Sequence, residues 1–218
     1  IVYVTVIIES TKKRKAMVAA HANDRVHKYQ RFLDCFKDNV LPKEVRIILI
    51  EEVLYNLRCM AKMDGGLPRT TRLLEEAKAT QQKIMKSPDT APTVPAVTNQ
   101  AQAKEVQNQF KNLLKILYYI GKTRKVHTKA INKSIKLLQS LCVETGVSLH
   151  RNIAENAIEQ SKEKLGLYHM NQAIGEYARV DSKRFASQIK ELREKIAQVE
   201  HQLRTTKQEQ KSSKKKAE

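Results

Sequence analysis

The sequence predicts an all-α fold in which two helical segments are joined by a Pro-rich linker. The chain has 218 residues but only 6 Gly and 5 Pro, so long stretches lack the residues that interrupt helices. Hydrophobic residues make up 41% of the chain, which is enough to build a core. In most segments they recur every three or four positions, the period of a helix with one buried face.

Residues 1–16 form a lead segment of uncertain origin. Residues 1–8 are an apolar, largely β-branched run too short to span a bilayer, and residues 12–15 are all basic. The run lacks the charged start and cleavage pattern of a secretory signal. A truncated membrane anchor with a basic flank is one interpretation. We expect instead a processed or extended leader on a cytoplasmic protein. Peripheral attachment to an anionic membrane through residues 1–16 is the weakest of the alternatives.

Residues 17–86 are expected to form an N-terminal helical domain of about three helices. An apolar seam from Ala22 to Val40 predicts a first helix that ends before Pro42. Pro42 suits the first turn of a second helix, which is apolar on more than one face and therefore central. Gly65 and Gly66 end that helix, and a third follows over residues 70–86.

Residues 87–98 contain three of the five prolines and no apolar period, which is typical of a linker. The rest is expected to form a C-terminal bundle over residues 99–206 and a disordered basic tail over residues 207–218. Within the bundle, Gly121, Gly146 and Gly166 are expected to end successive helices, and a long last helix begins near Tyr168.

The last helix carries an apolar seam with the four-three spacing of a coiled coil. A seam of this kind requires a partner helix, from this chain or from a second copy. The candidate oligomerisation residues are Phe185, Ile189, Leu192, Ile196, Val199 and Leu203.

The formal net charge of +18 favours polyanionic partners such as nucleic acid, an anionic membrane or an acidic protein. Between Glu105 and Glu144 there is no acidic residue. Five lysines in this window have helical spacing and predict a lysine stripe on one helix: Lys122, Lys125, Lys129, Lys133 and Lys136. Apolar residues lie roughly opposite them: Ile131, Ile135, Leu138 and Cys142. We expect the lysine stripe to contact phosphate, helped by Lys111, Lys115 and Arg124.

The segment from Cys142 to Ser148 resembles the turn of a helix-turn-helix DNA reader, with a small residue, a Gly four positions later and then Val-Ser. The resemblance implies a recognition helix from Ser148 in which His150, Arg151 and Asn152 face the DNA. Asn152 departs from the pattern, which has a branched apolar residue there. The favoured interpretation is that Gly146 simply ends a helix.

No pattern typical of catalysis is present. The histidines are scattered, the three cysteines are far apart, and neither a metal-ligand spacing nor a phosphate-binding glycine loop occurs. We therefore expect a non-enzymatic protein without a cofactor or metal that binds nucleic acid, DNA or RNA. The alternative is a helical adaptor or assembly subunit that docks an acidic protein or self-associates through its C-terminal coiled coil.

Overall fold

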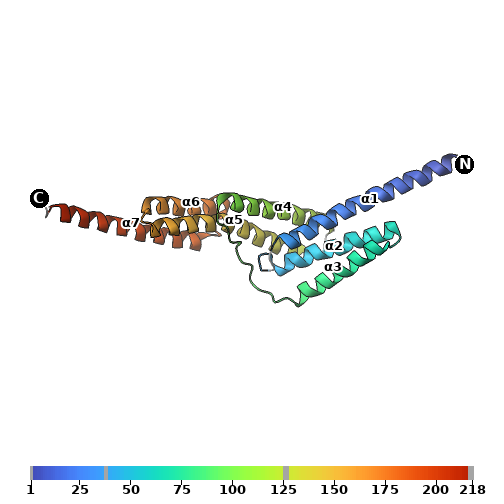
Figure 1. The fold of residues 1–218 in the computed structure, drawn as a ribbon, viewed down its shortest axis with the longest axis horizontal. Helices are drawn as coiled ribbons and strands as arrows, with labels where there is room; N and C mark the ends of the chain where they lie inside the picture. Colours follow the sequence, from blue (N-terminus) through green and yellow to red (C-terminus); the bar gives the residue numbers. More distant parts are fainter. Residues whose placement is uncertain (1, 37–38, 125–127, 216–218) are drawn as a thin grey trace. The chain divides into compact units, whose positions relative to one another are not determined.

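The computed structural model describes residues 2–36, 39–124 and 128–215, apart from the side chains of residues 2–8, 64 and 206–215. Within these ranges the chain forms helices and no strands (Figure 1), which confirms the all-α fold class. The helices are α1 (Val2–Cys35), α2 (Lys43–Asp64), α3 (Pro68–Lys86), α4 (Gln100–Arg124), α5 (Thr128–Glu159), α6 (Glu163–Asp181) and α7 (Ala186–Lys215).

The chain divides into two compact units, which are described separately. The first unit contains residues 1–93 and 117–137, and the second contains residues 94–116 and 138–218. The sequence predicts a single bundle over residues 99–206. The structure groups residues 117–137 with the N-terminal helices instead, and Ile120 and Ile131 are buried there.

In the first unit, α1 packs against α2, and α2 packs against α3. The expected seam of α1 is buried at Ala22, Val26, Tyr29 and Phe36. α1 begins at Val2, so the lead segment continues directly into this helix. The helix ends at Cys35, earlier than the seam predicts.

The central position expected for α2 agrees with its burial, which is complete at Val45, Leu49, Val53 and Leu57. Pro42 precedes the helix, and Gly65 ends it with a φ of 71°. A left-handed backbone of this kind favours glycine, because other residues meet a steric penalty there. Lys43 donates hydrogen bonds from Nζ to the carbonyls of Met85 (2.8 Å) and Ser87 (2.6 Å), which ties the end of α3 to the start of α2.

Residues 88–98 hold no helix among the described residues. The segment is nevertheless attached at two points, near its middle and near its end. The backbone N–H of Thr93 donates to the carbonyl of Asn39 over 2.8 Å. Val97 is buried in a small cluster with Ala103 and Leu149.

The second unit is built around Tyr177, whose ring stacks on that of Phe185 at a centroid distance of 4.8 Å. Val143, Val147, Ala173, Ile189 and Leu192 complete this core. The Tyr177 hydroxyl donates to the carboxylate of Glu144 over 2.8 Å. The core therefore joins α5, α6 and α7.

The predicted long last helix is present as the 30-residue α7, but its expected start near Tyr168 is wrong, because α6 ends at Asp181 and α7 begins at Ala186. The Asp181 carboxylate accepts hydrogen bonds from the backbone N–H groups of Lys183 (3.1 Å) and Arg184 (3.0 Å), which stabilises the interruption. At its other end α7 continues to Lys215, past residue 207 where the disordered tail is expected to begin. Lys, Gln and Glu in this stretch all have good helix propensity.

The seam assigned to oligomerisation is largely covered within the second unit. Phe185, Ile189, Leu192 and Val199 are buried, whereas Ile196 and Leu203 are partly exposed. α7 packs against α6 of the same chain. Those four residues consequently have a partner without a second copy.

Candidate nucleic-acid interface

The predicted lysine stripe does not lie on one helix. Lys122 is in the last turn of α4, and Lys129, Lys133 and Lys136 are on α5, while Lys125 lies outside the described residues. The prediction assumed that Gly121 ends a helix, but α4 continues to Arg124. A Cβ at Gly121 would lie 3.3 Å from Cγ2 of Ile131, so glycine serves close packing between α4 and α5 at this point.

The expected apolar side of α5 is confirmed. Ile131, Ile135 and Leu138 are buried, and Cys142 is partly buried. Lys129, Lys133 and Lys136 are exposed. Burial of the apolar residues therefore directs these lysines outward, even though Lys122 lies on a different helix.

Lys133 already has an acidic partner within the first unit. Its Nζ lies 2.9 Å from Oε1 of Glu44. The hydrogen bond from Lys133 holds the pKa of Glu44 below its ordinary value. An anion that binds Lys133 has to compete with this carboxylate, so Lys133 is a weaker candidate contact than Lys122 or Lys129.

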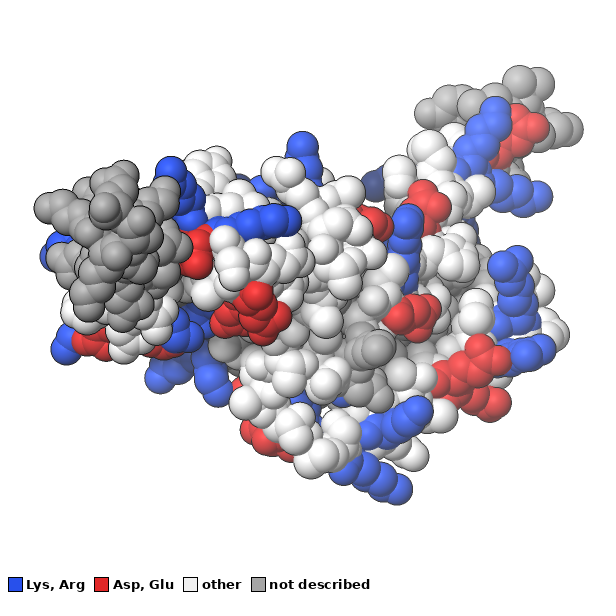
Figure 2. Space-filling model, turned by 60° about the vertical axis from the view of Figure 1, so that its left-hand side comes forward, with Lys and Arg blue, Asp and Glu red and all other residues white. Residues whose placement is uncertain are grey.

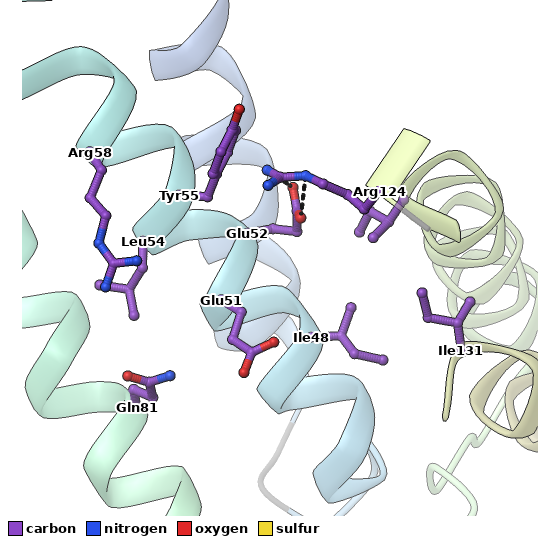
Figure 3. A pocket seen from close by; sticks show the side chains of 10 residues that line it. Ile48, Glu51, Glu52, Leu54, Tyr55, Arg58, Gln81, Arg124 and Ile131 are labelled. Carbon is purple, nitrogen blue, oxygen red and sulfur yellow. Dashed lines mark hydrogen bonds and ion pairs between the residues drawn. The ribbon is translucent and has the colours of Figure 1, made fainter. Parts of the chain in front are cut away.

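Arg124 has a structural role. Its guanidinium binds both carboxylate oxygens of Glu52, through Nε at 3.0 Å and Nη2 at 3.1 Å, and lies over the ring of Tyr55 (Figure 3). Burial raises the pKa of Glu52, and the charge of Arg124 opposes this shift. This bidentate, stacked arrangement engages Arg124 within the first unit rather than leaving it for phosphate.

Glu52, Tyr55 and Arg124 belong to the lining of a pocket of about 310 Å³ in the first unit. Glu51 and Arg58 add one charge of each sign to the lining, and Ile48, Leu54, Ile120 and Ile131 supply apolar surface (Figure 3). Because the charges of both signs are balanced, the pocket does not favour an anion. The pocket therefore adds no residues to the predicted nucleic-acid interface.

The resemblance to a helix-turn-helix is not supported by the structure. α5 runs without interruption from Thr128 to Glu159, so Gly146 neither forms a turn nor ends a helix. A Cβ at Gly146 would lie 2.6 Å from Nε2 of Gln107. The amide of Gln107 donates from this nitrogen to the Cys142 carbonyl over 3.2 Å. Gly146 thus makes room for a side chain of α4.

Of the three residues assigned to base reading, one contacts another side chain of the second unit and a second is enclosed by protein. The Nδ1 atoms of His150 and His169 are 3.1 Å apart and the two rings stack, while burial lowers the pKa of His150. Nε and Nη2 of Arg151 are enclosed by protein and have no hydrogen-bond partner among the described residues. Asn152 is exposed. His150 and Arg151 therefore do not form a reading surface.

The structure supports a different basic surface, on the part of α4 that belongs to the second unit. The inward side of this part is buried at Ala103, Phe110 and Leu113. Lys104, Lys111 and Lys115 are exposed, and we call them the α4 lysine face. Their spacings of seven and four positions place them within about 40° of one another around the helix.

The α4 lysine face has no acidic neighbour in contact. None of its three lysines forms an ion pair or hydrogen bond with the described residues. By contrast, Figure 2 shows places where basic and acidic side chains lie next to each other. On α7, for example, Lys190 and Lys195 lie 3.9 Å and 3.4 Å from Glu194 and Glu191.

The sequence analysis included Lys111 and Lys115 but missed Lys104. Lys104 lies just outside the acid-free window, because Glu105 follows it directly. Adjacent residues on a helix point about 100° apart, so Glu105 does not share the lysine face. The spacing of seven positions between Lys104 and Lys111 is the feature of the sequence that places Lys104 on the same side of the helix.

The described residues hold no group of three or more His, Cys, Asp or Glu side chains arranged to bind a metal ion. Among the helices that the structure describes, none has an apolar stretch long enough to cross a bilayer. No family model, no curated protein and no solved structure matches this chain.

Proposed function

We propose that this protein binds nucleic acid without catalysing a reaction, mainly through contacts from exposed lysines to phosphate. The α4 lysine face carries this proposal. Its three lysines share one side of a helix, lie in a region nearly free of acidic residues, and have no partner among the described residues. Like charges at helical spacing repel one another, and a bound polyanion relieves that repulsion.

The length of the α4 lysine face suits an extended polyanion. Lys104 and Lys115 are eleven residues apart, which corresponds to about 16 Å along the helix axis. One strand of a duplex carries a phosphate about every 3.4 Å of its axis, so several phosphates come within reach. A small anion would contact at most two of the three lysines, because Lys104 lies about 10 Å along the axis from Lys111.

The first unit adds Lys122 and Lys129 as exposed candidates for phosphate contact. Lys133 can contribute only when its ion pair with Glu44 is broken. Arg124, His150 and Arg151 are no longer part of the proposal, because they are engaged or enclosed within the protein. Without a base-reading helix, the expected binding is independent of sequence and does not distinguish DNA from RNA.

An adaptor that docks an acidic protein remains the alternative. Self-association through α7 has less support, because four residues of its seam are buried within the chain. An acidic protein partner would use the same lysines. Binding to nucleic acid is therefore the property to measure first.

The decisive experiment measures the affinity of the full chain for a short duplex and a single strand over a range of salt concentrations. For duplex DNA, the logarithm of the affinity should fall with the logarithm of the salt concentration by about 0.9 for each phosphate contacted. Replacing the α4 lysine face (Lys104→Gln, Lys111→Gln, Lys115→Gln) should reduce the magnitude of that slope by about two to three.

A variant of α7 provides the matched control. Lys190→Gln, Lys195→Gln and Arg204→Gln together remove the same amount of charge, but each of these residues already lies near a glutamate four positions away. The control should bind almost as well as the unmodified chain. Equal losses in both variants would mean that net charge alone determines the affinity. No binding at low salt would reject the proposal.

A further inference from the structure

The N-terminal part of α1 carries a second basic surface that the proposed function does not use. All residues from Glu9 to Val18 are exposed, and the first buried residue of the helix is Ala22. In Figure 1 this part of α1 extends beyond α2 and α3 of the same unit. The expected lead segment is therefore a bare helical extension of the folded unit.

The charges of this extension are consecutive. Lys12, Lys13, Arg14 and Lys15, which we call the basic ring, are all exposed, and none forms an ion pair or hydrogen bond with the described residues. No acidic residue occurs between Glu9 and Asp24. Successive helical residues are about 100° and 1.5 Å apart, so the basic ring surrounds the helix within about 4.5 Å of its axis length.

A ring of charge meets a partner differently from a line of charge. A strand of nucleic acid lying along α1 would contact only one or two of the four residues, since the others point away. A flat anionic surface crossed by the helix axis would contact all four at the same depth. The basic ring therefore fits the headgroup layer of an anionic membrane better than a linear polyanion.

The sequence next to the basic ring agrees with this geometry. Apart from Thr5, residues 1–8 are apolar or aromatic, and in a helix they would occupy about 12 Å. Ile8 precedes Lys12 by four positions, which is about 6 Å along the axis. Apolar residues followed within one turn by basic residues are typical of the boundary between the acyl and headgroup regions of a bilayer.

We propose that the N-terminal part of α1 binds an anionic membrane surface, with the basic ring at the lipid headgroups and residues 1–8 among the acyl chains. From the sequence alone, membrane attachment through residues 1–16 is the weakest alternative, because these residues read as a leader separate from the fold. Their continuity with α1 changes that interpretation. The inference is independent of nucleic-acid binding and uses different residues.

Co-sedimentation of the full chain with vesicles tests the proposal. Vesicles of phosphatidylcholine alone should bind weakly, and an equal mixture with phosphatidylglycerol should bind strongly. Each basic residue at an anionic surface contributes about fivefold in affinity, so neutralising the basic ring (Lys12→Gln, Lys13→Gln, Arg14→Gln, Lys15→Gln) should weaken binding roughly 100-fold or more. Gln preserves helix propensity, and circular dichroism should show an unchanged helix content.

The matched control neutralises four lysines of α4: Lys104→Gln, Lys111→Gln, Lys115→Gln and Lys122→Gln. This variant should keep its vesicle binding and lose affinity for nucleic acid. The variant with the neutralised basic ring, which we call the ring variant, should lose vesicle binding and keep its affinity for nucleic acid. Equal loss of vesicle binding in both variants, or vesicle binding that is unaffected in the ring variant, overturns the membrane proposal. That outcome leaves the nucleic-acid measurement intact as a separate result.

The chain has no Trp, so an introduced one reports its own surroundings. With anionic vesicles, the emission of a Tyr3→Trp variant should shift to shorter wavelength as the indole leaves water. A Tyr168→Trp variant, at an exposed position of α6, should show no shift. An unshifted Trp at position 3, or equal shifts at both positions, contradicts insertion.

Discussion

α1 and α4 both expose basic side chains, but they arrange them in different ways. The basic ring of α1 surrounds its helix at one level, whereas the α4 lysine face follows one side of its helix for about 16 Å. The opposite side of α4 is buried, while α1 is exposed on every side from Glu9 to Val18. The spacing of the charges on a helix, more than their number, therefore determines the shape of the partner that they fit.

The largest expected contrast is in stability. Phe110, on the inward side of α4, is completely buried, and Met17 of α1 is 60% exposed. Phe110→Ala should lower the free energy of unfolding by about 3–5 kcal/mol, because it leaves a cavity. Met17→Ala should change it by less than about 0.5 kcal/mol. Urea denaturation measures both values, and similar losses would show that the α1 extension is packed after all.

A second contrast concerns pH. The unit that contains the α4 lysine face also holds His150, whose pKa is lowered by burial and by His169. The unfolded chain therefore takes up this proton more readily, and stability should fall as the pH drops below the ordinary histidine value of about 6.5. Thermal unfolding of the unmodified chain should show this loss. A His150→Gln variant should show a smaller one. An identical pH dependence in both would assign the effect to other groups.

A third contrast moves one charge without changing the total. Combining Lys111→Gln with Asn112→Lys turns one charge of the α4 lysine face by about 100° around the helix. Affinity for duplex DNA should fall, and the magnitude of the salt slope should decrease by about one. Unchanged affinity would mean that the alignment of these lysines is irrelevant.

The smallest effect is expected from the corresponding change in α1. Combining Arg14→Gln with Ala16→Lys moves a charge around the helix but only about 3 Å along it. Binding to anionic vesicles should therefore stay within about twofold, because headgroups surround the helix on all sides. A loss similar to that in the ring variant would favour a partner that contacts one side of α1.

Much of the fold could be predicted from the sequence because apolar periodicity directly reflects burial. The seam of α1, the burial of α2 and the apolar side of α5 at Ile131, Ile135 and Leu138 all follow from spacing alone. The helix end at Gly65 was also predictable. There a Gly pair follows Asp64 and precedes Pro68, and the local sequence itself requires a turn.

The other glycines show where local sequence is insufficient. Gly121 and Gly146 lie inside helices because Ile131 and Gln107 approach them closely. Gly166 likewise lies within α6, where a Cβ would come 2.6 Å from Cγ1 of Ile158. A glycine that allows close packing and a glycine that ends a helix look alike until the neighbouring helix is known. The error at Gly121 placed the lysine stripe on one helix, and the error at Gly146 produced the resemblance to a DNA reader.

The candidate interface was only partly predictable for a related reason. Charge and spacing identified Lys111 and Lys115 as exposed basic residues. They did not reveal that Arg124 binds Glu52 or that Lys133 binds Glu44, since these pairs join residues more than seventy positions apart. Which cations are neutralised within the protein depends on tertiary contacts.

The continuity of α1 has a consequence for any surface that binds its exposed end. Ala22, the first buried residue, lies seven positions after Lys15, so the helix acts as a spacer of about 10 Å between that surface and the folded unit. This length matches the distance of about 8–10 Å over which salt screens charge at physiological ionic strength. A membrane held at the basic ring would therefore act on the basic side chains of the folded first unit with a surface potential reduced to about a third.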